Sequence, residues 1–194
     1  MAFPFIAYGF ARSSVITRQG DNIEQPIPFS HRHHVGDDGI DCRYCHTSVE
    51  HSTFAGLPST ETCVGCHSQL WTQASVLQPL RDSWSQHKPI IWNRVYNLPD
   101  FVFFNHEIHV HHGVGCSTCH GDVSTQALTR KSAPLTMQWC MDCHRWPEQY
   151  LRPLDKITDP HWQPPPDQLQ RGAELVRTLH IEKTHLVNCD TCHR

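Results

Sequence analysis

The chain has no long hydrophobic run, no cluster of basic residues and no cysteine outside one repeated motif. Its 194 residues are 38% hydrophobic, with a mean hydropathy of −0.49 and a formal net charge of −3. Because no Lys/Arg run occurs, there is no obvious surface for nucleic acid. The apolar stretch at residues 1–10 would span about 15 Å as a helix, against a hydrocarbon core of about 30 Å. That stretch is therefore too short to cross a bilayer.

All ten cysteines belong to five copies of Cys-x-x-Cys-His, and none is left over. In this motif the two thiols form thioethers to the haem vinyl groups, and the histidine becomes the proximal iron ligand. Zinc sites and disulfides also use paired cysteines, but neither requires histidine at the fifth position. The motifs therefore predict five covalently bound haem c groups. The predicted attachment residues are Cys42, Cys45, Cys63, Cys66, Cys116, Cys119, Cys140, Cys143, Cys189 and Cys192, and the predicted proximal ligands are His46, His67, His120, His144 and His193.

Five haems leave roughly 39 residues for each cofactor, too few to wrap each one in a core of its own. We expect the porphyrins to form most of the interior, and the 14 prolines and 10 glycines favour loops. The predicted fold class is a multihaem cytochrome c, mostly irregular, with a few short α-helices around five haems and little β-structure. Haem attachment needs reduced thiols outside the cytoplasm, so we expect an extracytoplasmic protein.

An internal duplication precedes the first and third motifs. The sequence Phe-x-His-x-x-His-Val begins at Phe29 and again at Phe104, and each copy has a glycine three residues before its first motif cysteine. A second haem motif follows each block, so the chain reads as two dihaem modules and a tail. The predicted units are an N-terminal segment (1–28), a first module (29–100), a second module (101–160) and a tail with the fifth haem (161–194). Segment 1–28 is either a membrane-anchor stub, an interfacial segment or an ordinary apolar tail.

Three regular segments are expected between and after the modules. Residues 70–84 have apolar side chains near helical spacing but contain Pro79, which predicts a short bent helix. Residues 90–96 look extended. In the tail, Asp167 can cap a helix after three prolines, and this helix is expected to pack on the last haem. Its predicted apolar face consists of Leu169, Ala173, Val176 and Leu179.

Twelve histidines lie outside the motifs, more than surface loops ordinarily need. The repeated blocks predict that His31, His34, His106 and His109 are distal iron ligands. A separation of three residues lets two imidazoles diverge to different haems, so one segment can hold two cofactors close together. The flanking histidines are expected to support these ligands or to face solvent; they are His33, His111 and His112.

The spacing leaves the fifth distal ligand open. The histidine candidates are His185, His180, His161, His51 and His87. The remaining candidate is Met137, three residues before Cys140. A methionine ligand would raise the potential of its haem relative to two histidines, whereas an unligated methionine would simply pack against a porphyrin.

Several segments also carry a family resemblance. They are residues 25–31, 42–47, 99–106, 135–137 and 189–194. Over residues 25–194 the chain resembles the pentahaem cytochrome c subunit of bacterial alternative complex III. The Leu-Thr-Met triplet that ends at Met137 belongs to this resemblance, which favours Met137 over the histidines as the fifth distal ligand.

The resemblance implies a subunit of a menaquinol-oxidising membrane complex on the periplasmic face of the cytoplasmic membrane. Electrons would arrive from an iron-sulfur subunit beside integral membrane subunits that hold the quinol site. They would leave to a monohaem cytochrome c or a small copper protein, in a respiratory or photosynthetic chain. The chain itself would be an electron carrier and not an enzyme, with no nucleic-acid partner.

Two other functions use the same motifs. A multihaem reductase for nitrite, hydroxylamine or tetrathionate needs one iron with an open position, which the supply of distal histidines disfavours. A free soluble multihaem shuttle shares the Phe-x-His-x-x-His pattern and needs no membrane neighbours. Co-purification with integral subunits would separate the shuttle from a complex subunit.

Overall fold

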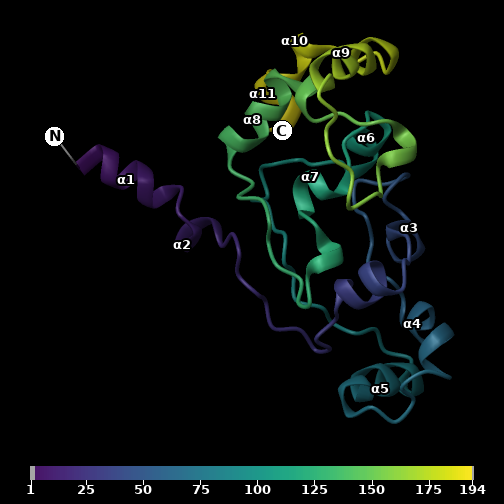
Figure 1. Cartoon of the computed structure of the whole chain (residues 1–194). Helices are drawn as coiled ribbons and strands as arrows, with labels where there is room; N and C mark the ends of the chain where they lie inside the picture. Colours follow the sequence, from purple (N-terminus) through teal and green to yellow (C-terminus); the bar gives the residue numbers. More distant parts are fainter. Residues whose placement is uncertain (1–2, 194) are drawn as a thin grey trace.

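The computed structural model describes residues 3–193, which form short helices joined by long loops (Figure 1). Met1 and Ala2 of the predicted segment 1–28, and Arg194 of the predicted tail 161–194, lie outside the described residues. Within 3–193 there is no β-strand, and the isolated antiparallel bridges are Asn22–Arg130, Val102–His193 and Val114–Leu151. The prediction of a loop-rich fold with short helices and little β-structure is confirmed.

Each Cys-x-x-Cys-His motif forms a helical turn, which places the two cysteines on the same side because they are three residues apart. The motif helices are α3 (Cys42–Cys45), α4 (Thr60–His67), α7 (Cys116–His120), α8 (Met137–Arg145) and α11 (Cys189–Cys192). Side-chain caps start three of them: Asp41 accepts from the Arg43 N–H, Ser59 from that of Thr62, and Thr136 from that of Trp139. Capping thus fixes where these motif turns begin.

The two Phe-x-His-x-x-His blocks also become helical. The first forms a π-helix, η1 (Arg32–Asp37), and the second an α-helix, α6 (His106–His111). The remaining helical elements are α1 (Phe3–Ala11), α2 (Ser14–Thr17), η2 (Ser75–Leu77), α5 (Gln78–Gln86), η3 (Val123–Thr125), η4 (Pro147–Gln149), η5 (Leu154–Lys156), α9 (Gln168–Thr178) and α10 (Lys183–Leu186).

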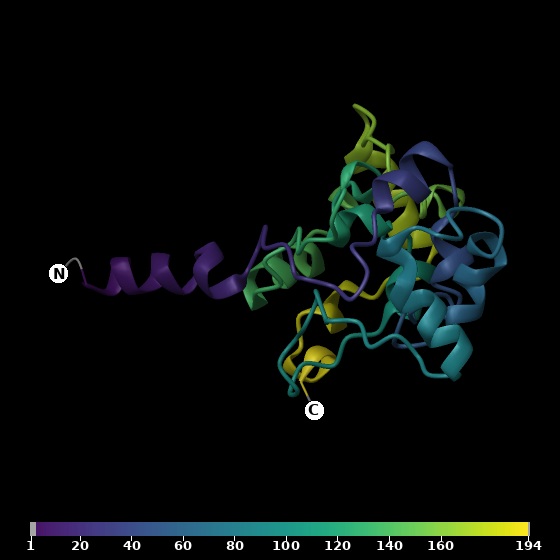
Figure 2. The same cartoon turned by 90° about the horizontal axis from the view of Figure 1, so that it is seen from below.

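The N-terminal helices α1 and α2 extend away from the rest of the chain, as Figures 1 and 2 show from two directions. Every described residue of α1 is exposed, including Phe3, Phe5 and Phe10. The chain joins the body where the Gly20 N–H donates to the Lys131 carbonyl at 2.8 Å. No helix within residues 3–193 combines the length and apolar character needed to cross a membrane.

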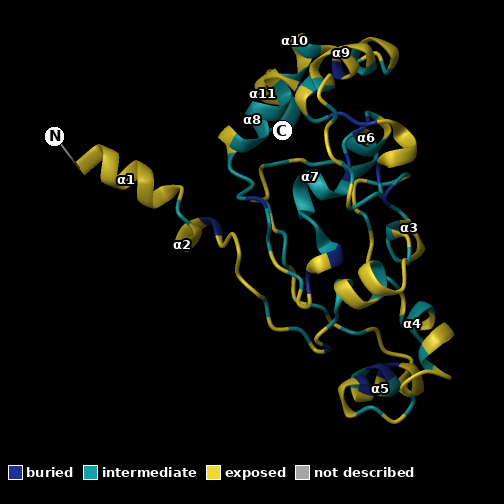
Figure 3. Cartoon of the chain, viewed as in Figure 1, coloured by how far each residue is buried: buried dark blue, intermediate teal, exposed yellow. Residues whose placement is uncertain are grey.

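Buried residues are few and scattered along the chain (Figure 3), and the apolar ones among them are fewer still. One cluster consists of Ile27, Leu77 and Leu80, with Val64 and Trp92 packed against it. It joins the end of the N-terminal segment to α4 and α5. The predicted bent helix over 70–84 is wrong in its first half, because α5 begins at Gln78 with Pro79 in its first turn, where the missing N–H costs nothing.

The predicted C-terminal helix is present as α9, but it contacts η4 through a residue outside its predicted apolar face and lacks the predicted cap. The packing of that apolar face on the last haem stays a prediction. Leu169 is 62% exposed and Ala173 is exposed, whereas Gly172 is buried against η4. The Asp167 side chain makes no cap bond and instead pairs with Arg171, 2.9 Å away. The face that packs on η4 is therefore set by close backbone approach at a glycine, which a search for large apolar residues does not detect.

Candidate haem sites

Both histidine blocks have the same local geometry. In the first, the Phe29 ring is edge-on to His31 at 4.9 Å and stacked on His34 at 4.5 Å. In the second, Phe104 is edge-on to His106 at 4.7 Å and 4.5 Å from His109. The phenylalanine therefore fixes the two imidazoles of each block in different directions, even though one block is a π-helix and the other an α-helix.

Within each block the second histidine is held by its own helix. Nδ1 of His34 lies 2.9 Å from the Ser30 carbonyl, and Nδ1 of His109 lies 2.7 Å from the Asn105 carbonyl. Since each carbonyl accepts from Nδ1–H, the Nε2 atom keeps its lone pair. That tautomer is the one a metal ligand needs.

The first histidine of each block is held by the other module. Nδ1 of His31 lies 2.9 Å from Thr129 Oγ1, and Nδ1 of His106 lies 2.9 Å from the Thr53 carbonyl. The first block is thus anchored by residues of the second module, and the second block by residues of the first. The orientation of these imidazoles therefore links the two predicted modules.

Most motif histidines have the same type of anchor. The Nδ1 atoms of His46, His67, His144 and His193 lie 2.7–3.1 Å from the carbonyl oxygens of Gly56, Leu70, Leu186 and Phe101, respectively. Each ring is thereby fixed with Nε2 unbonded. The remaining motif histidine is His120, which belongs to the third motif.

Three motif histidines face a block histidine at a recurring separation. The ring centroids are 6.2 Å apart for His34 and His67, 6.4 Å for His106 and His120, and 6.2 Å for His109 and His144. Two imidazoles bound through Nε2 to opposite sides of one metal ion, at about 2 Å each, have centroids roughly 6.3 Å apart. Each pair therefore has the spacing of two axial ligands of one iron.

Burial favours the neutral form of His31, His106, His109 and His120. It lowers the pKa of His120 to about 4, with further lowering by His106, His46 and His31. Burial likewise lowers the pKa of His31 to about 4, followed by the effects of His46 and His34. The pKa values of His106 and His109 are also lowered, mainly by burial. A neutral imidazole is the ligating form.

The remaining block histidine is His31, and the charge of His46 lowers its pKa. His31 is the block histidine that has no centroid contact with a motif histidine, and His46 is the motif histidine whose charge acts most on it. His31 and His46 are thus neighbours. His46 also lowers the pKa values of His106 and His120, so the first and third sites are close neighbours.

The thiols connect the first site to two others. Cys42 and Cys116 line one small cavity together with Thr158, and the pKa of Cys116 is raised first by Cys42 and then by burial. On the other side, burial raises the pKa of Cys45, and the Cys42 and Cys66 thiols raise it further. The first motif therefore lies between the second and the third.

The later motifs continue the series. Burial raises the pKa of Cys119 to about 12, with added effects of Cys143 and Cys140. Burial also raises the pKa of Cys140, and Cys192 of the fifth motif raises it further. Helix α8 packs against α10, which directly precedes the fifth motif. The spatial series of motifs is thus second, first, third, fourth, fifth.

The candidates for the fifth distal ligand lie at the surface. Met137 is the first residue of α8 and is 67% exposed. The histidine candidates His51, His87, His161, His180 and His185 are exposed. None of these six side chains has a ring contact with His193, whose partner is Phe101 at 5.8 Å. Met137 nevertheless lies on α8, the helix that neighbours the fifth motif.

The flanking histidines differ in their contacts. His33 lies 3.6 Å from Asp37 and 3.7 Å from Asp38, and Nε2 of His111 lies 2.9 Å from the Glu50 carbonyl. His112 instead has Nδ1 2.6 Å from the Ile108 carbonyl, the anchor found at His34 and His109. Sequence spacing alone could have suggested His112, because it lies three residues after His109.

The donor set fits haem c. Each motif offers two thiols and one imidazole, three of these imidazoles face a second one at axial-ligand spacing, and all ten thiols are unpaired. Within residues 3–193 no group of three or more His, Cys, Asp or Glu side chains could hold a bare ion. Iron in a porphyrin needs only the two axial ligands that these pairs offer.

These features are those of a multihaem c-type cytochrome. Residues 102–194 match the family described as "Cytochrome c7 and related cytochrome c". The chain is also similar to the "Menaquinone reductase, multiheme cytochrome c subunit" of Nitratidesulfovibrio vulgaris (strain Hildenborough). The two are 36% identical over 142 residues, which cover 62% of this chain and 68% of that protein. The chain therefore belongs to the family of multihaem cytochromes c that includes this subunit, and its chemistry is electron transfer.

Proposed function

We propose that the chain is a five-haem electron-transfer subunit of a quinone-linked membrane complex, located on the periplasmic face of the cytoplasmic membrane. The observation that carries the proposal is the set of three imidazole pairs at 6.2–6.4 Å. Such pairs fill both axial positions of an iron, so they serve an electron carrier and not a substrate-binding centre.

The proposed axial pairs follow from these separations. His34 pairs with His67, His106 with His120, and His109 with His144. His31 is assigned to His46 on their mutual proximity. For His193 we retain Met137, on the family resemblance and on its position in α8, with His112 as the rival on geometry.

Haem c supplies reversible one-electron chemistry when it is bound. The residues of this chain hold, orient and separate the sites. The carbonyl and hydroxyl acceptors at Nδ1 fix each imidazole plane, and adjacent motif thiols keep neighbouring sites close. The series of motifs would therefore conduct electrons between an end at the second motif and an end at the fifth.

The proposed partners are an iron-sulfur subunit and integral membrane subunits, with a monohaem cytochrome c or a small copper protein as the other redox partner. The resemblance to alternative complex III favours menaquinol oxidation, with electrons entering this subunit from the iron-sulfur subunit. The name of the N. vulgaris relative favours a second candidate, in which electrons pass through the subunit towards menaquinone. Both place the chain in a complex, unlike a free shuttle.

The first test is an electron paramagnetic resonance spectrum of the oxidised protein, with haem content and mass determined on the same sample. We expect five haems per chain, all low-spin. The planes of His34 and His67 are 66° apart and those of His106 and His120 are 10° apart, so the second site should give a more anisotropic signal than the third. A high-spin signal that shifts with nitrite, hydroxylamine or tetrathionate would contradict the electron-carrier function and indicate a reductase with an open iron.

The same sample tests the fifth ligand. If Met137 binds iron, the oxidised protein has a near-infrared sulfur-to-iron charge-transfer band that Met137→Leu abolishes. A spectrum without that band contradicts Met137, and loss of one low-spin signal in His112→Ala would then support His112. Co-purification with integral membrane subunits separates the complex subunit from a free shuttle.

A further inference from the structure

Arg152 is the one charged side chain within residues 3–193 that is buried, with 3% of its surface exposed. Its guanidinium lies 4.4 Å from the ring centre of Trp162. Such burial is unusual for an arginine unless it is paired with an acid or has a specific role. The immediate surroundings of Arg152 therefore need an explanation.

The guanidinium is directed at the third haem motif. Nη2 donates to Ser117 Oγ at 3.0 Å and to Thr118 Oγ1 at 3.4 Å, and these are the two residues between the motif cysteines. Nη1 donates to the carbonyls of Lys156 and Asp159. Arg152 thus lies against the thioether-forming turn of α7.

The backbone before the motif is shaped to admit this side chain. A Cβ atom at Gly115 would lie 2.1 Å from Arg152 Cζ, so any larger residue would displace the guanidinium. The Arg152 N–H also donates to the Gly113 carbonyl at 2.9 Å. In the first module the position that corresponds to Gly115 is Asp41, so the duplicated blocks differ at this point.

The charge of Arg152 is not compensated by an ion pair. No carboxylate oxygen within residues 3–193 lies within 4.0 Å of it, and its Nε atom has no hydrogen-bond partner. Asp159 acts on it only from beyond that distance. Burial lowers the pKa of the guanidinium, but arginine remains protonated in proteins. A buried positive charge therefore remains beside the third motif.

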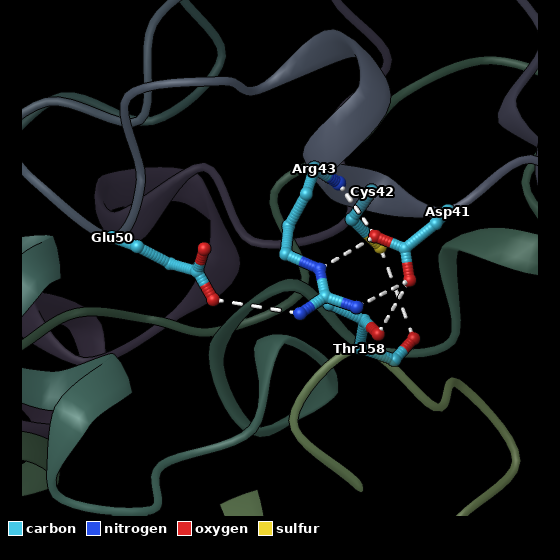
Figure 4. Close-up of polar contacts among 5 residues, drawn as sticks. All are labelled: Asp41, Cys42, Arg43, Glu50 and Thr158. Atoms are coloured by element: carbon cyan, nitrogen blue, oxygen red, sulfur yellow. Dashed lines mark hydrogen bonds and ion pairs between the residues drawn. The ribbon is translucent and has the colours of Figure 1, made fainter. Parts of the chain in front are cut away.

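The first motif has the opposite local charge. Asp41 binds Arg43 at 2.9 Å and accepts from the Thr158 hydroxyl at 2.8 Å, and Arg43 also reaches Glu50 at 3.5 Å (Figure 4). Two carboxylates and one guanidinium leave one net negative charge beside this motif. These side chains are partly exposed, so solvent screens them more than it screens Arg152.

We propose that Arg152 raises the reduction potential of the haem at the third motif above that of the haem at the first. This inference rests on the proposed haem sites. A nearby positive charge favours the reduced form of a haem, and the effect is strongest where water is excluded. Asp122, two residues after His120, opposes it weakly because its side chain is 39% exposed.

The consequence is a direction for one step of the series. One electron moves from the reduced iron of the first site to the oxidised iron of the third; the first is oxidised from Fe(II) to Fe(III) and the third is reduced from Fe(III) to Fe(II). No proton or bond is exchanged. Electrons that enter at the second motif are thereby drawn to the third.

The test is a spectropotentiometric titration of the haem-loaded protein, monitored by electron paramagnetic resonance to identify the signal from the nearly parallel His106 and His120 rings. Arg152→Met removes the charge, Arg152→Gln removes it but keeps a donor, and Arg152→Lys keeps it. The control is Arg171→Met, because Arg171 is exposed and paired with Asp167.

The signal reports the oxidised haem at the third motif. For Arg152→Met and Arg152→Gln, at one fixed solution potential, we expect the ratio of reduced to oxidised haem at that motif to fall at least about tenfold. That fall corresponds to a decrease of about 59 mV in its reduction potential. Arg152→Lys should keep most of the wild-type value, and Arg171→Met all of it. Equal shifts in the Lys and Gln variants, or no shift in either neutral variant, overturn the proposal for Arg152. Fewer than five low-spin haems in the wild type would instead contradict the proposed function. If Arg152→Met does not fold, the difference in this potential between Arg152→Gln and Arg152→Lys decides whether the charge is responsible.

Discussion

At the scale of residues, the orientation of each imidazole depends on an acceptor that lies elsewhere in the fold. His31 is anchored by Thr129, and His106 by the Thr53 carbonyl, across the two modules. The identity of a ligand can be predicted from a local pattern, but its plane is set by such a remote contact. Ring planes in turn determine the magnetic signature of each site, which makes the anchors experimentally visible.

Thr129→Val should disturb the first site alone. Removing the hydroxyl leaves Nδ1 of His31 without its partner in a half-buried position, which costs about 1 kcal/mol in the free energy of unfolding. We expect a changed low-spin signal for one haem and a lower unfolding temperature. Thr129→Ser, which keeps the hydroxyl, is the matched control. Identical spectra for Val and wild type would show that this contact does not orient His31.

Residue patterns predicted more of the sites than of their surroundings. The motif turns and the paired block histidines were identified from spacing, and the structure brings three block histidines opposite motif histidines. Arg152 and the anchor of His112 were missed, because neither a lone arginine nor a histidine beside two others carries a motif. The fifth ligand stays a prediction, since Met137 and its rivals are distinguished by tertiary placement and not by local sequence.

At the scale of elements, close backbone contact replaces apolar packing at the C-terminal helix. A Cβ atom at Gly172 would lie 1.9 Å from the Glu148 carbonyl oxygen, so α9 approaches η4 through backbone atoms. The sequence predicted the helix correctly, but it gave no sign of this contact with η4. Periodicity detects where apolar side chains recur, and it cannot reveal a face defined by the absence of a side chain.

Gly172→Ala should therefore destabilise the protein, although alanine favours helix formation. Overpacking by a methyl group typically costs about 1–3 kcal/mol, and here the obstacle is backbone that cannot rotate away. Thermal unfolding of the haem-loaded protein measures the effect. Gln170→Ala, at an exposed position of the same helix, should leave the unfolding temperature unchanged or slightly higher. A neutral or stabilising result at Gly172 would contradict the close packing of α9 on η4.

At the scale of the whole molecule, the protein interior is poor in apolar side chains. Of the described residues, the buried hydrophobic ones are Ile27, Val49, Leu77, Leu80, Ala133, Leu151 and Ile157. So small a set supports only a fraction of the hydrophobic free energy that a chain of this length usually gains. The small number of apolar side chains that the polypeptide itself buries agrees with the expectation that porphyrins supply most of the interior.

The chain made without haem should accordingly fail to fold cooperatively. Expression in a host that lacks the haem-attachment machinery, or replacement of all ten cysteines by serine, gives the comparison. We expect loss of most helical circular dichroism, rapid proteolysis and no sharp thermal transition, in contrast to the haem-loaded protein. A cooperative transition in the haem-free chain would show that the polypeptide supplies its own core.

The reciprocal anchors between the modules have a consequence for how the protein is made. Thr129 follows His31 by 98 residues, so the first block cannot reach its final orientation until the chain has been made as far as Thr129. If haems are attached while the chain is still unfolded, the early motifs would carry their haems before the first block is oriented. The protein would then complete its fold in one late step, and not one predicted module after the other.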